Sequence, residues 1–290
     1  MNQTILVTGA NGQVGSELRA LAANYPQFGF LFADRQHLDL CNEAQTTDFM
    51  AQQPLFACIN CAAYTAVDKA ESDSLNAYAI NVTAPALLAR LCAEHGAHFV
   101  HYSSDYVYNT TQNTPIHESA PLSPQGVYAK TKAEGDAAVL AANPHAIILR
   151  TAWVYSSFGQ NFVKTMLRLG AERDTLNVVY DQIGTPTYAR DLAQATLDIL
   201  VWLAPKVLPN VGGVYHYSNS GVASWYDFAR VIHRIKDIRC HINPIRSADF
   251  LTPAPRPSFS VLDKTAVQNV FGLNIRHWQD ALEDCLSRID

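Results

Sequence analysis

Hydrophobic and polar positions in the first half of the chain follow two periods. Short runs rich in β-branched and aromatic residues, typical of buried strands, occur at 4–9, 28–34, 55–61, 98–103 and 145–151. Between the third and fourth runs an apolar stripe repeats at helical spacing and predicts a helix packed on the sheet, through Leu75, Ala79, Val82 and Ala86. Another helix is predicted to begin near Gln125. Strands that alternate with helices predict βαβ units and a parallel sheet.

The alternation weakens after about residue 150, where short apolar runs are separated by segments rich in Pro and Gly. The Pro-rich stretch 244–257 contains Phe250, Leu251 and Arg256, a composition that favours an ordered loop over a pocket rather than a disordered linker. We therefore expect a smaller second lobe in this half of the chain.

A glycine-rich loop, GANGQVG at 9–15, follows the first predicted strand and leads into a helical segment. Gly9 permits a tight turn, Gly12 allows the backbone to approach a pyrophosphate, and Gly15 allows close packing of helix on strand. The spacing G-x-x-G-x-x-G, rather than the broader G-x-G-x-x-G, favours short-chain dehydrogenases of the extended kind.

These patterns predict an α/β fold with a Rossmann-type, doubly wound parallel sheet and a smaller C-terminal substrate-binding lobe. The dinucleotide-binding domain is expected at 1–150. Residues 151–290 are expected to form mainly the substrate-binding lobe, with a segment at about 176–203 returning to the Rossmann core.

The second strand ends in two charged residues that bear on the choice of cofactor. Asp34 lies 19 residues after Gly15, where a carboxylate accepts hydrogen bonds from the adenosine ribose and favours NAD. Arg35 follows directly, and its guanidinium can hold the 2′-phosphate of NADP. NADPH and NADH both stay open as cofactors. Asp39 and Leu40 are expected to flank the adenine ring or, alternatively, to form a solvated turn.

A Tyr-x-x-x-Lys pair supplies candidate catalytic groups. A carbonyl reductase delivers a hydride to carbon and a proton to oxygen, and free tyrosine is a weak acid. Tyr128 and Lys132 lie four residues apart on one predicted helix face, so Lys132 is expected to lower the Tyr128 pKa and hold the nicotinamide ribose. Ser104, which ends the fourth strand, would orient the substrate carbonyl. The other acids, Asp105 and Asp136, are interpreted as a loop residue and part of a solvated helix face.

Composition narrows the function classes. A net charge of −5 offers no basic patch for nucleic acid, and no apolar run reaches the length of a membrane span. The N-terminus lacks the features of a signal peptide, so we expect a cytoplasmic protein with small-molecule partners. Cys58 and Cys61 form a C-x-x-C inside a predicted strand, where they would face opposite sides, and neither a redox nor a metal site is predicted.

Several longer segments resemble the dTDP-4-dehydrorhamnose reductase family: CAAYTAVDKAESD at 61–73, YSSDYVY at 102–108, VYAKTKAEGD at 127–136, RTAWVY at 150–155, NFVKTMLRL at 161–169, DQIGTPTYARDLA at 181–193 and TPAPRPSFSVLD at 252–263. The resemblance covers nearly the whole chain. It implies that NADPH or NADH reduces the C4 ketone of dTDP-4-dehydro-6-deoxy-L-mannose, a nucleotide sugar, to dTDP-L-rhamnose.

The resemblance also assigns ligand contacts by motif. It implies cofactor contacts for Asn11, Gly12, Gln13, Val14, Ala62, Ala63, Tyr64, Thr65 and Tyr102. It implies substrate contacts for Val67, Ser104, Asp105, Tyr128, Trp153 and Arg256. Trp153 is otherwise a core aromatic residue, whereas Arg256 stands between two prolines, where a fixed guanidinium suits a diphosphate.

The chain departs from the family pattern at a few positions. Ser104 stands where Thr is common, Ala129 where Gly is usual, and Tyr108, Asn109 and Thr110 where Phe, Asp and Gly are common. Some relatives bridge a dimer through acidic residues and a divalent metal. Because Arg190 stands beside Asp191 here, no metal is expected, and a homodimer is one option.

Two other functions compete with the reductase. A non-catalytic, NADP-binding regulatory subunit would not need the intact Ser104, Tyr128 and Lys132. An epimerase or dehydratase of another nucleotide-linked deoxysugar is the third reading, but a dehydratase usually has acidic residues after the Ser or Thr, and Asp105 supplies one.

Overall fold

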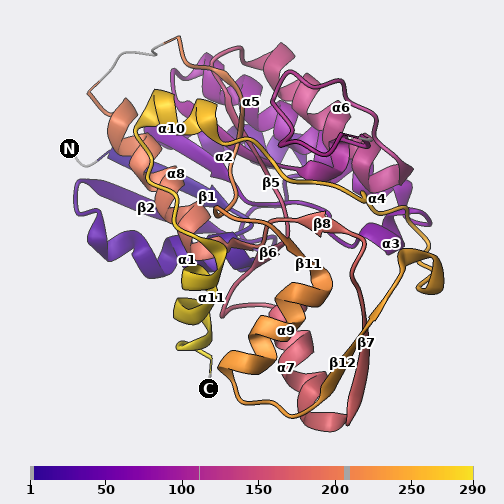
Figure 1. The fold of residues 1–290 in the computed structure, drawn as a ribbon. Helices are drawn as coiled ribbons and strands as arrows, with labels where there is room; N and C mark the ends of the chain where they lie inside the picture. Colours follow the sequence, from indigo (N-terminus) through magenta and orange to yellow (C-terminus); the bar gives the residue numbers. More distant parts are fainter. Residues whose placement is uncertain (1–2, 111, 206–209, 290) are drawn as a thin grey trace.

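A computed structural model describes residues 3–110, 112–205 and 210–289 and contains a central six-stranded sheet. In sheet order its strands are β10 (Gly213–His216), β5 (Ile147–Thr151), β4 (His98–Ser104), β3 (Leu55–Asn60), β1 (Gln3–Thr8) and β2 (Phe28–Ala33), and each neighbouring pair is parallel. The predicted Rossmann-type α/β fold is confirmed (Figure 1). The strand order reverses beside β1, which opens a crevice at the carboxyl ends of β1 and β3.

Helices cover both faces of this sheet. One face packs against α1 (Gln13–Leu21), α8 (Ala189–Leu203) and α10 (Thr265–Phe271), and the other against α2 (Glu43–Ala51), α5 (Ala84–Glu94) and α6 (Gly126–Ala142). Successive side chains of a strand point to opposite faces of the sheet, so neighbouring residues belong to different cores. Thus Ile5 and Val7 belong to the first core and Leu6 to the second. Cys58 and Cys61 likewise lie on opposite sides, as expected.

The single helix predicted between the third and fourth strands is interrupted. The chain forms α3 (Val67–Ala70), α4 (Ser74–Tyr78) and a π-helical turn (Ala79–Thr83) before α5 begins. Val82 is buried, but Leu75 is 86% exposed, so its predicted place on the sheet is wrong. The wider π turn shifts the helical register, and a stripe extrapolated across it no longer lies on one face.

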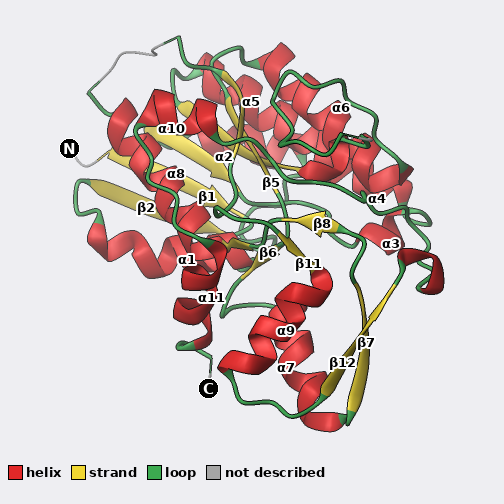
Figure 2. Cartoon of the chain, in the orientation of Figure 1, coloured by secondary structure: helices red, strands yellow, loops and turns green. Residues whose placement is uncertain are grey.

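The second lobe is built from α7 (Phe162–Glu172), α9 (Trp225–Ile235) and α11 (Trp278–Leu286) around the parallel pair β7 (Thr175–Val179) and β12 (His241–Ile245) (Figures 1 and 2). Two short strand pairs form where the chain passes from one lobe to the other. They are β6 (Val154–Tyr155) with β9 (Thr187–Tyr188), and β8 (Ile183–Gly184) with β11 (Ala223–Ser224). Within 176–203, β7 therefore pairs outside the central sheet, whereas α8 packs against it. In the described ranges, no helix is long and apolar enough to cross a membrane.

Candidate active site

The glycine-rich loop joins β1 to α1 at the crevice. Gly9 has φ +60°, and a Cβ placed there would lie 2.6 Å from the Ala62 nitrogen of the loop after β3. A Cβ on Gly15 would lie 2.6 Å from the Gly9 carbonyl oxygen. Glycine is therefore required at both positions, one to let the two loops approach and the other to let α1 pack beneath the turn. The amino end of α1 consequently faces the crevice.

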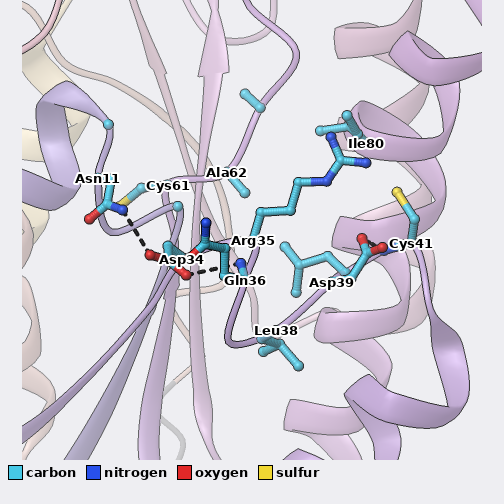
Figure 3. Close-up of a pocket in the computed structure, with 14 residues that line it drawn as sticks. Asn11, Asp34, Arg35, Gln36, Leu38, Asp39, Cys41, Cys61, Ala62 and Ile80 are labelled. Atoms are coloured by element: carbon cyan, nitrogen blue, oxygen red, sulfur yellow. Dashed lines mark hydrogen bonds between the residues drawn. The ribbon is translucent and has the colours of Figure 1, made fainter.

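A cavity of about 600 Å³ opens beside this loop and is shown in Figure 3. Its lining includes most of the predicted cofactor residues: Gly9, Asn11, Gly12, Asp34, Arg35, Asp39, Leu40, Ala62 and Ala63. Asn11 Nδ2 donates to Asp34 Oδ2 over 2.8 Å, and His37 Nδ1 lies 2.6 Å from Asp34 Oδ1. The hydrogen bonds from His37 are the main cause that lowers the pKa of Asp34 to about 2. Arg35 extends across the cavity toward Ile80 (Figure 3).

The remaining predicted cofactor residues lie at varied places around the crevice. Gln13 contacts the second lobe, because its Oε1 accepts a hydrogen bond from Asn161, and Val14 packs on the core beneath the sheet. Tyr64 donates its hydroxyl to Asp73, and Thr65 is exposed.

Tyr102 presents its side chain and its carbonyl oxygen to different partners. Its side chain lies on the opposite face of the sheet, where its hydroxyl bonds Thr196 of α8, because strand alternation turns it away from α6. Only its carbonyl oxygen reaches the site, where it meets Lys132.

Tyr128 and Lys132 come from the first two turns of α6. Glu71 accepts a hydrogen bond from the Val127 backbone nitrogen over 2.8 Å and so fixes the start of this helix. Lys132 is 2% exposed, and its Nζ donates to the Tyr102 carbonyl oxygen over 2.7 Å. Burial lowers the pKa of Lys132 to about 8.

The expectation that Lys132 lowers the Tyr128 pKa is not met. Burial raises the pKa of Tyr128 to about 12, and the Ser104 hydroxyl offsets this only in part. Lys132 directs its ammonium to the Tyr102 carbonyl instead. The Tyr106 ring packs edge-on against the Tyr128 ring at a centroid distance of 5.4 Å. Tyr128 is thus a protonated phenol at neutral pH.

The two other acids are buried, which corrects the interpretation of Asp136 as part of a solvated helix face. Asp105 is 2% exposed, and Ser104 Oγ donates to its Oδ1 over 3.0 Å. Burial raises the pKa of Asp105 to about 6. Asp136 is also 2% exposed, and its Oδ2 lies 2.8 Å from Nε of the buried Arg150. The hydrophobic contacts of α6 with the sheet therefore surround an ion pair.

The predicted substrate residues lie toward the second lobe. Trp153, at φ +49°, stacks on Trp225 with ring centroids 3.7 Å apart, a partner that the sequence did not indicate. Arg256 lines a second cavity of about 200 Å³ with Tyr106, and its Nη2 lies 2.8 Å from Asp68 Oδ2. Val67 begins the helix α3 that carries Asp68. The Pro-rich loop is therefore ordered over a cavity.

A loop-bracing residue was also missed by the sequence reasoning. Asn81, in the π-helical turn, accepts from the Tyr64 backbone nitrogen over 2.9 Å and donates to Thr131 Oγ1 of α6 over 3.1 Å. It therefore ties the loop after β3 to the helix that carries Tyr128. The only signal in the sequence was a polar residue inside an apolar helical stripe.

Comparison with known proteins adds to this geometry. A model of the RmlD substrate binding domain matches residues 3–290. A dTDP-4-dehydrorhamnose reductase of Aggregatibacter actinomycetemcomitans is 38% identical, with 97% of each chain covered. The chain belongs to the dTDP-4-dehydrorhamnose reductase family. The crystal structure of the Bacillus anthracis member in complex with NADP has a TM-score of 0.92 and 33% identity, and covers 99% of each chain.

Another relative carries a different name at similar identity. A probable dTDP-4,6-dihydroxy-2-methyloxan-3-one 4-ketoreductase of Streptomyces antibioticus is 39% identical, with 98% of this chain and 95% of the relative covered. Overall identity to the dTDP-4-dehydrorhamnose reductase family therefore does not single out one keto sugar.

Tyr108, one of the departures from the family pattern, is accommodated inside the protein. The Tyr108 hydroxyl accepts from Arg150 Nη1 over 2.6 Å and lies 2.8 Å from His216 Nε2, so it is buried away from solvent. Arg190 pairs with Glu17, and Asp191 pairs with Arg276. Within the described part of the chain, no three His, Cys, Asp or Glu side chains are grouped to hold a metal ion.

Proposed function

We propose that this chain reduces the C4 ketone of dTDP-4-dehydro-6-deoxy-L-mannose to dTDP-L-rhamnose with NADPH or NADH. The observation that carries the proposal is that Ser104 hydrogen-bonds Tyr128 and Lys132 reaches the Tyr102 carbonyl of β4, while the loops after β1 and β3 line a cavity. Membership of the reductase family supports the substrate. A homodimer and a cytoplasmic location stay predictions.

The residues beside the glycine-rich loop fit a dinucleotide. The absence of a Cβ at Gly9 lets the glycine-rich loop lie close to the loop after β3. The backbone N–H groups at the start of α1 favour binding of a pyrophosphate. Asp34 and Arg35 line the same cavity, where they would hold the adenosine ribose and a 2′-phosphate. When bound, the reduced nicotinamide cofactor supplies the hydride.

The chain's own residues supply the proton and the orientation. Tyr128, protonated at neutral pH because of its raised pKa, donates a proton to the ketone oxygen. Below a pH of about 8, the charged Lys132 stabilises the tyrosinate that forms. Ser104 Oγ, held by Asp105, is placed to turn its hydrogen bond toward the ketone. Arg256, braced by Asp68, binds the diphosphate of the nucleotide sugar.

The decisive experiment compares wild-type enzyme with Tyr128→Phe, using NADPH oxidation and product analysis with dTDP-4-dehydro-6-deoxy-L-mannose. We expect kcat to fall by about 10²-fold or more in the variant because the proton donor is lost. Tyr78→Phe, on the exposed side of α4, is the matched control and should retain activity. Unchanged turnover in Tyr128→Phe would contradict the mechanism. A wild-type preference for the keto sugar of the Streptomyces relative would correct the substrate.

The cofactor assignment has its own test. Arg35→Ala should raise KM for NADPH and leave KM for NADH nearly unchanged, because only NADPH carries the 2′-phosphate. An equal change for both cofactors would mean that Arg35 does not contact that phosphate.

A further inference from the structure

Three polar side chains form a row across the central sheet beneath the start of α6. Thr8 of β1 is in register with Asn60 of β3, and Asn60 is in register with His101 of β4. Each of the three is about 1% exposed. The residues two positions earlier on these strands, Leu6, Cys58 and Phe99, are apolar core. Polar groups buried this deeply are costly unless hydrogen-bonded, so the contacts of this row determine its chemistry.

The direction of the hydrogen bonds follows from Asn60. Its Oδ1 accepts from Thr8 Oγ1 over 2.7 Å and from the Ala62 backbone nitrogen over 3.2 Å. Its Nδ2 therefore faces His101 Nδ1, 3.1 Å away. Because an amide nitrogen only donates, Nδ1 of His101 accepts, and the neutral ring carries its proton on Nε2. Burial, with the nearby Lys132, holds the pKa of His101 well below its usual value, so the ring is neutral.

That Nε2 faces the catalytic lysine. The distance from His101 Nε2 to Lys132 Nζ is 3.5 Å, and Nζ also donates to the Tyr102 carbonyl oxygen. A ring N–H can donate to a neutral amine but cannot accept from an ammonium. His101 consequently favours the neutral form of Lys132, while Asp136, one turn further along α6, favours the charged form.

We propose that His101 is a positioning residue that holds Lys132 against the Tyr102 carbonyl and couples the charge of Lys132, through Asn60, to the loop at the cofactor cavity. This inference rests on the proposed roles of Tyr128 and Lys132. The charge of Lys132 and the loop are coupled because a change in the direction of one hydrogen bond in the row reverses the next. For the Lys132 ammonium to donate to Nε2, the ring proton must move to Nδ1 and Asn60 must turn its oxygen toward His101. The Asn60 amide group would then face the Ala62 N–H, which would lose its acceptor.

The coupling reaches the cofactor side directly. Ala62 lines the 600 Å³ cavity and packs against Gly9, so a change in its hydrogen bond changes the wall of that cavity. We therefore expect His101 to affect cofactor affinity as well as turnover.

Two substitutions at His101 test the inference. His101→Leu removes both ring nitrogens, and His101→Gln keeps a donor and an acceptor on a chain of similar reach. His98→Leu, on the opposite face of the same strand, is the matched control. For each protein we would measure NADPH affinity by fluorescence titration and kcat for the keto sugar from pH 6 to 10, with Tyr128→Phe run in parallel.

We expect His101→Leu to weaken NADPH binding and lower kcat by about tenfold each, the effect of leaving a buried hydrogen-bonding group unpaired. The alkaline limb of its pH profile should move by at least about half a pH unit, because the partner of Lys132 has changed. His101→Gln should recover part of both losses, and His98→Leu should match wild type. His101→Leu with NADPH affinity and kcat within twofold of wild type and an unmoved alkaline limb would overturn the proposal, as would a His101→Gln variant no better than His101→Leu.

A spectroscopic measurement applies to the wild-type protein even if a variant fails to fold. With ¹⁵N-labelled histidine above pH 8, where Lys132 is neutral, the His101 ring should be neutral and protonated on Nε2. Its signals are those missing from His101→Gln or, if that variant does not fold, those correlated through bonds with the His101 backbone. Protonation on Nδ1 at this pH would overturn the hydrogen-bond direction. Failure of the proposed function is distinguishable, since wild type would then bind NADPH without reducing the keto sugar.

Discussion

Asp136→Asn should strongly destabilise the fold, because it removes the charge that balances a buried arginine. The Asp136 and Arg150 side chains are 3% and 4% exposed, and the distance from Oδ2 to Nε is 2.8 Å. Asparagine keeps the shape and can still accept one hydrogen bond, but it leaves a guanidinium without a counter-charge in the core.

The size of the effect follows from what remains around Arg150. Removing one partner of a buried ion pair costs roughly 3–5 kcal/mol. Arg150 keeps the Tyr108 hydroxyl at 2.6 Å and lies over the Tyr108 ring, which compensates in part. We therefore expect a loss near the lower limit, about 3 kcal/mol in the free energy of unfolding.

Urea unfolding measures this loss as a lower midpoint at an unchanged slope. The matched control is Glu172→Gln, which breaks the exposed Arg168–Glu172 pair on α7 and should cost less than about 0.5 kcal/mol. Replacing Asp136 and Arg150 together by apolar residues should cost less than the sum of the single changes. A loss below about 1 kcal/mol for Asp136→Asn would refute this reasoning.

The same variant should change the pH dependence of activity. Asp136 raises the pKa of Lys132, against the burial that lowers it to about 8. Without the carboxylate this pKa falls further, so Lys132 loses its charge at a lower pH and the alkaline limb of kcat moves toward neutral. An alkaline limb that stays in place in folded Asp136→Asn would show that Lys132 does not set it.

Three further changes test other parts of the structure. Gly9→Ala should weaken NADPH binding by at least about tenfold because its Cβ would lie 2.6 Å from the Ala62 nitrogen. Gly96→Ala, also at positive φ but with open space around it, should cost only about 1 kcal/mol of stability. Equal NADPH affinities of the two variants would contradict this. Trp225→Ala removes the stack on Trp153 and should raise KM for the nucleotide sugar more than it lowers kcat; steady-state kinetics with KM within twofold of wild type would exclude a substrate role for this stack. Burial, with Arg150 nearby, lowers the pKa of His216 to about 3, so between pH 6.5 and pH 3 the unfolded chain binds a proton that the folded chain does not. The free energy of unfolding measured with urea should therefore fall from pH 6.5 toward pH 3. His216→Gln should reduce this slope, and an unchanged slope would refute the reasoning.

The central sheet could be predicted because its strands are buried on both faces and appear as continuous apolar runs. The run at 28–34, for example, became Phe28–Ala33. The pairs β6 with β9 and β8 with β11 have two residues per strand, too short to leave a periodic signal, and they form because tertiary packing brings them together. The π-helical turn before α5 was missed for the opposite reason, since the helical period continued in the sequence across a register shift.

In the candidate site, too, local features could be predicted from the sequence and long-range pairs could not. The glycine spacing and the pair Tyr128 and Lys132 are local patterns, so the sequence could reveal them. The Arg256–Asp68 pair joins residues 188 positions apart, and nothing in either neighbourhood indicates its partner. The prediction that Asp136 is solvated was wrong because polarity alone cannot show whether a fold supplies a buried acid with a partner.

The departures from the family pattern therefore bear unequally on the choice of sugar. Tyr108 is a change of residue type at the site, but its hydroxyl is committed to Arg150 and His216 inside the protein. Tyr108 and Asn109 both line the small cavity with Arg256, but Tyr108 is 1% exposed whereas Asn109 is exposed. An exposed side chain at the cavity can offer its polar atoms to the substrate, whereas a buried one whose hydroxyl is already hydrogen-bonded contributes only to the shape of the wall. Differences in sugar preference between this chain and its relatives should therefore follow Asn109 and the loop that carries Arg256 rather than Tyr108.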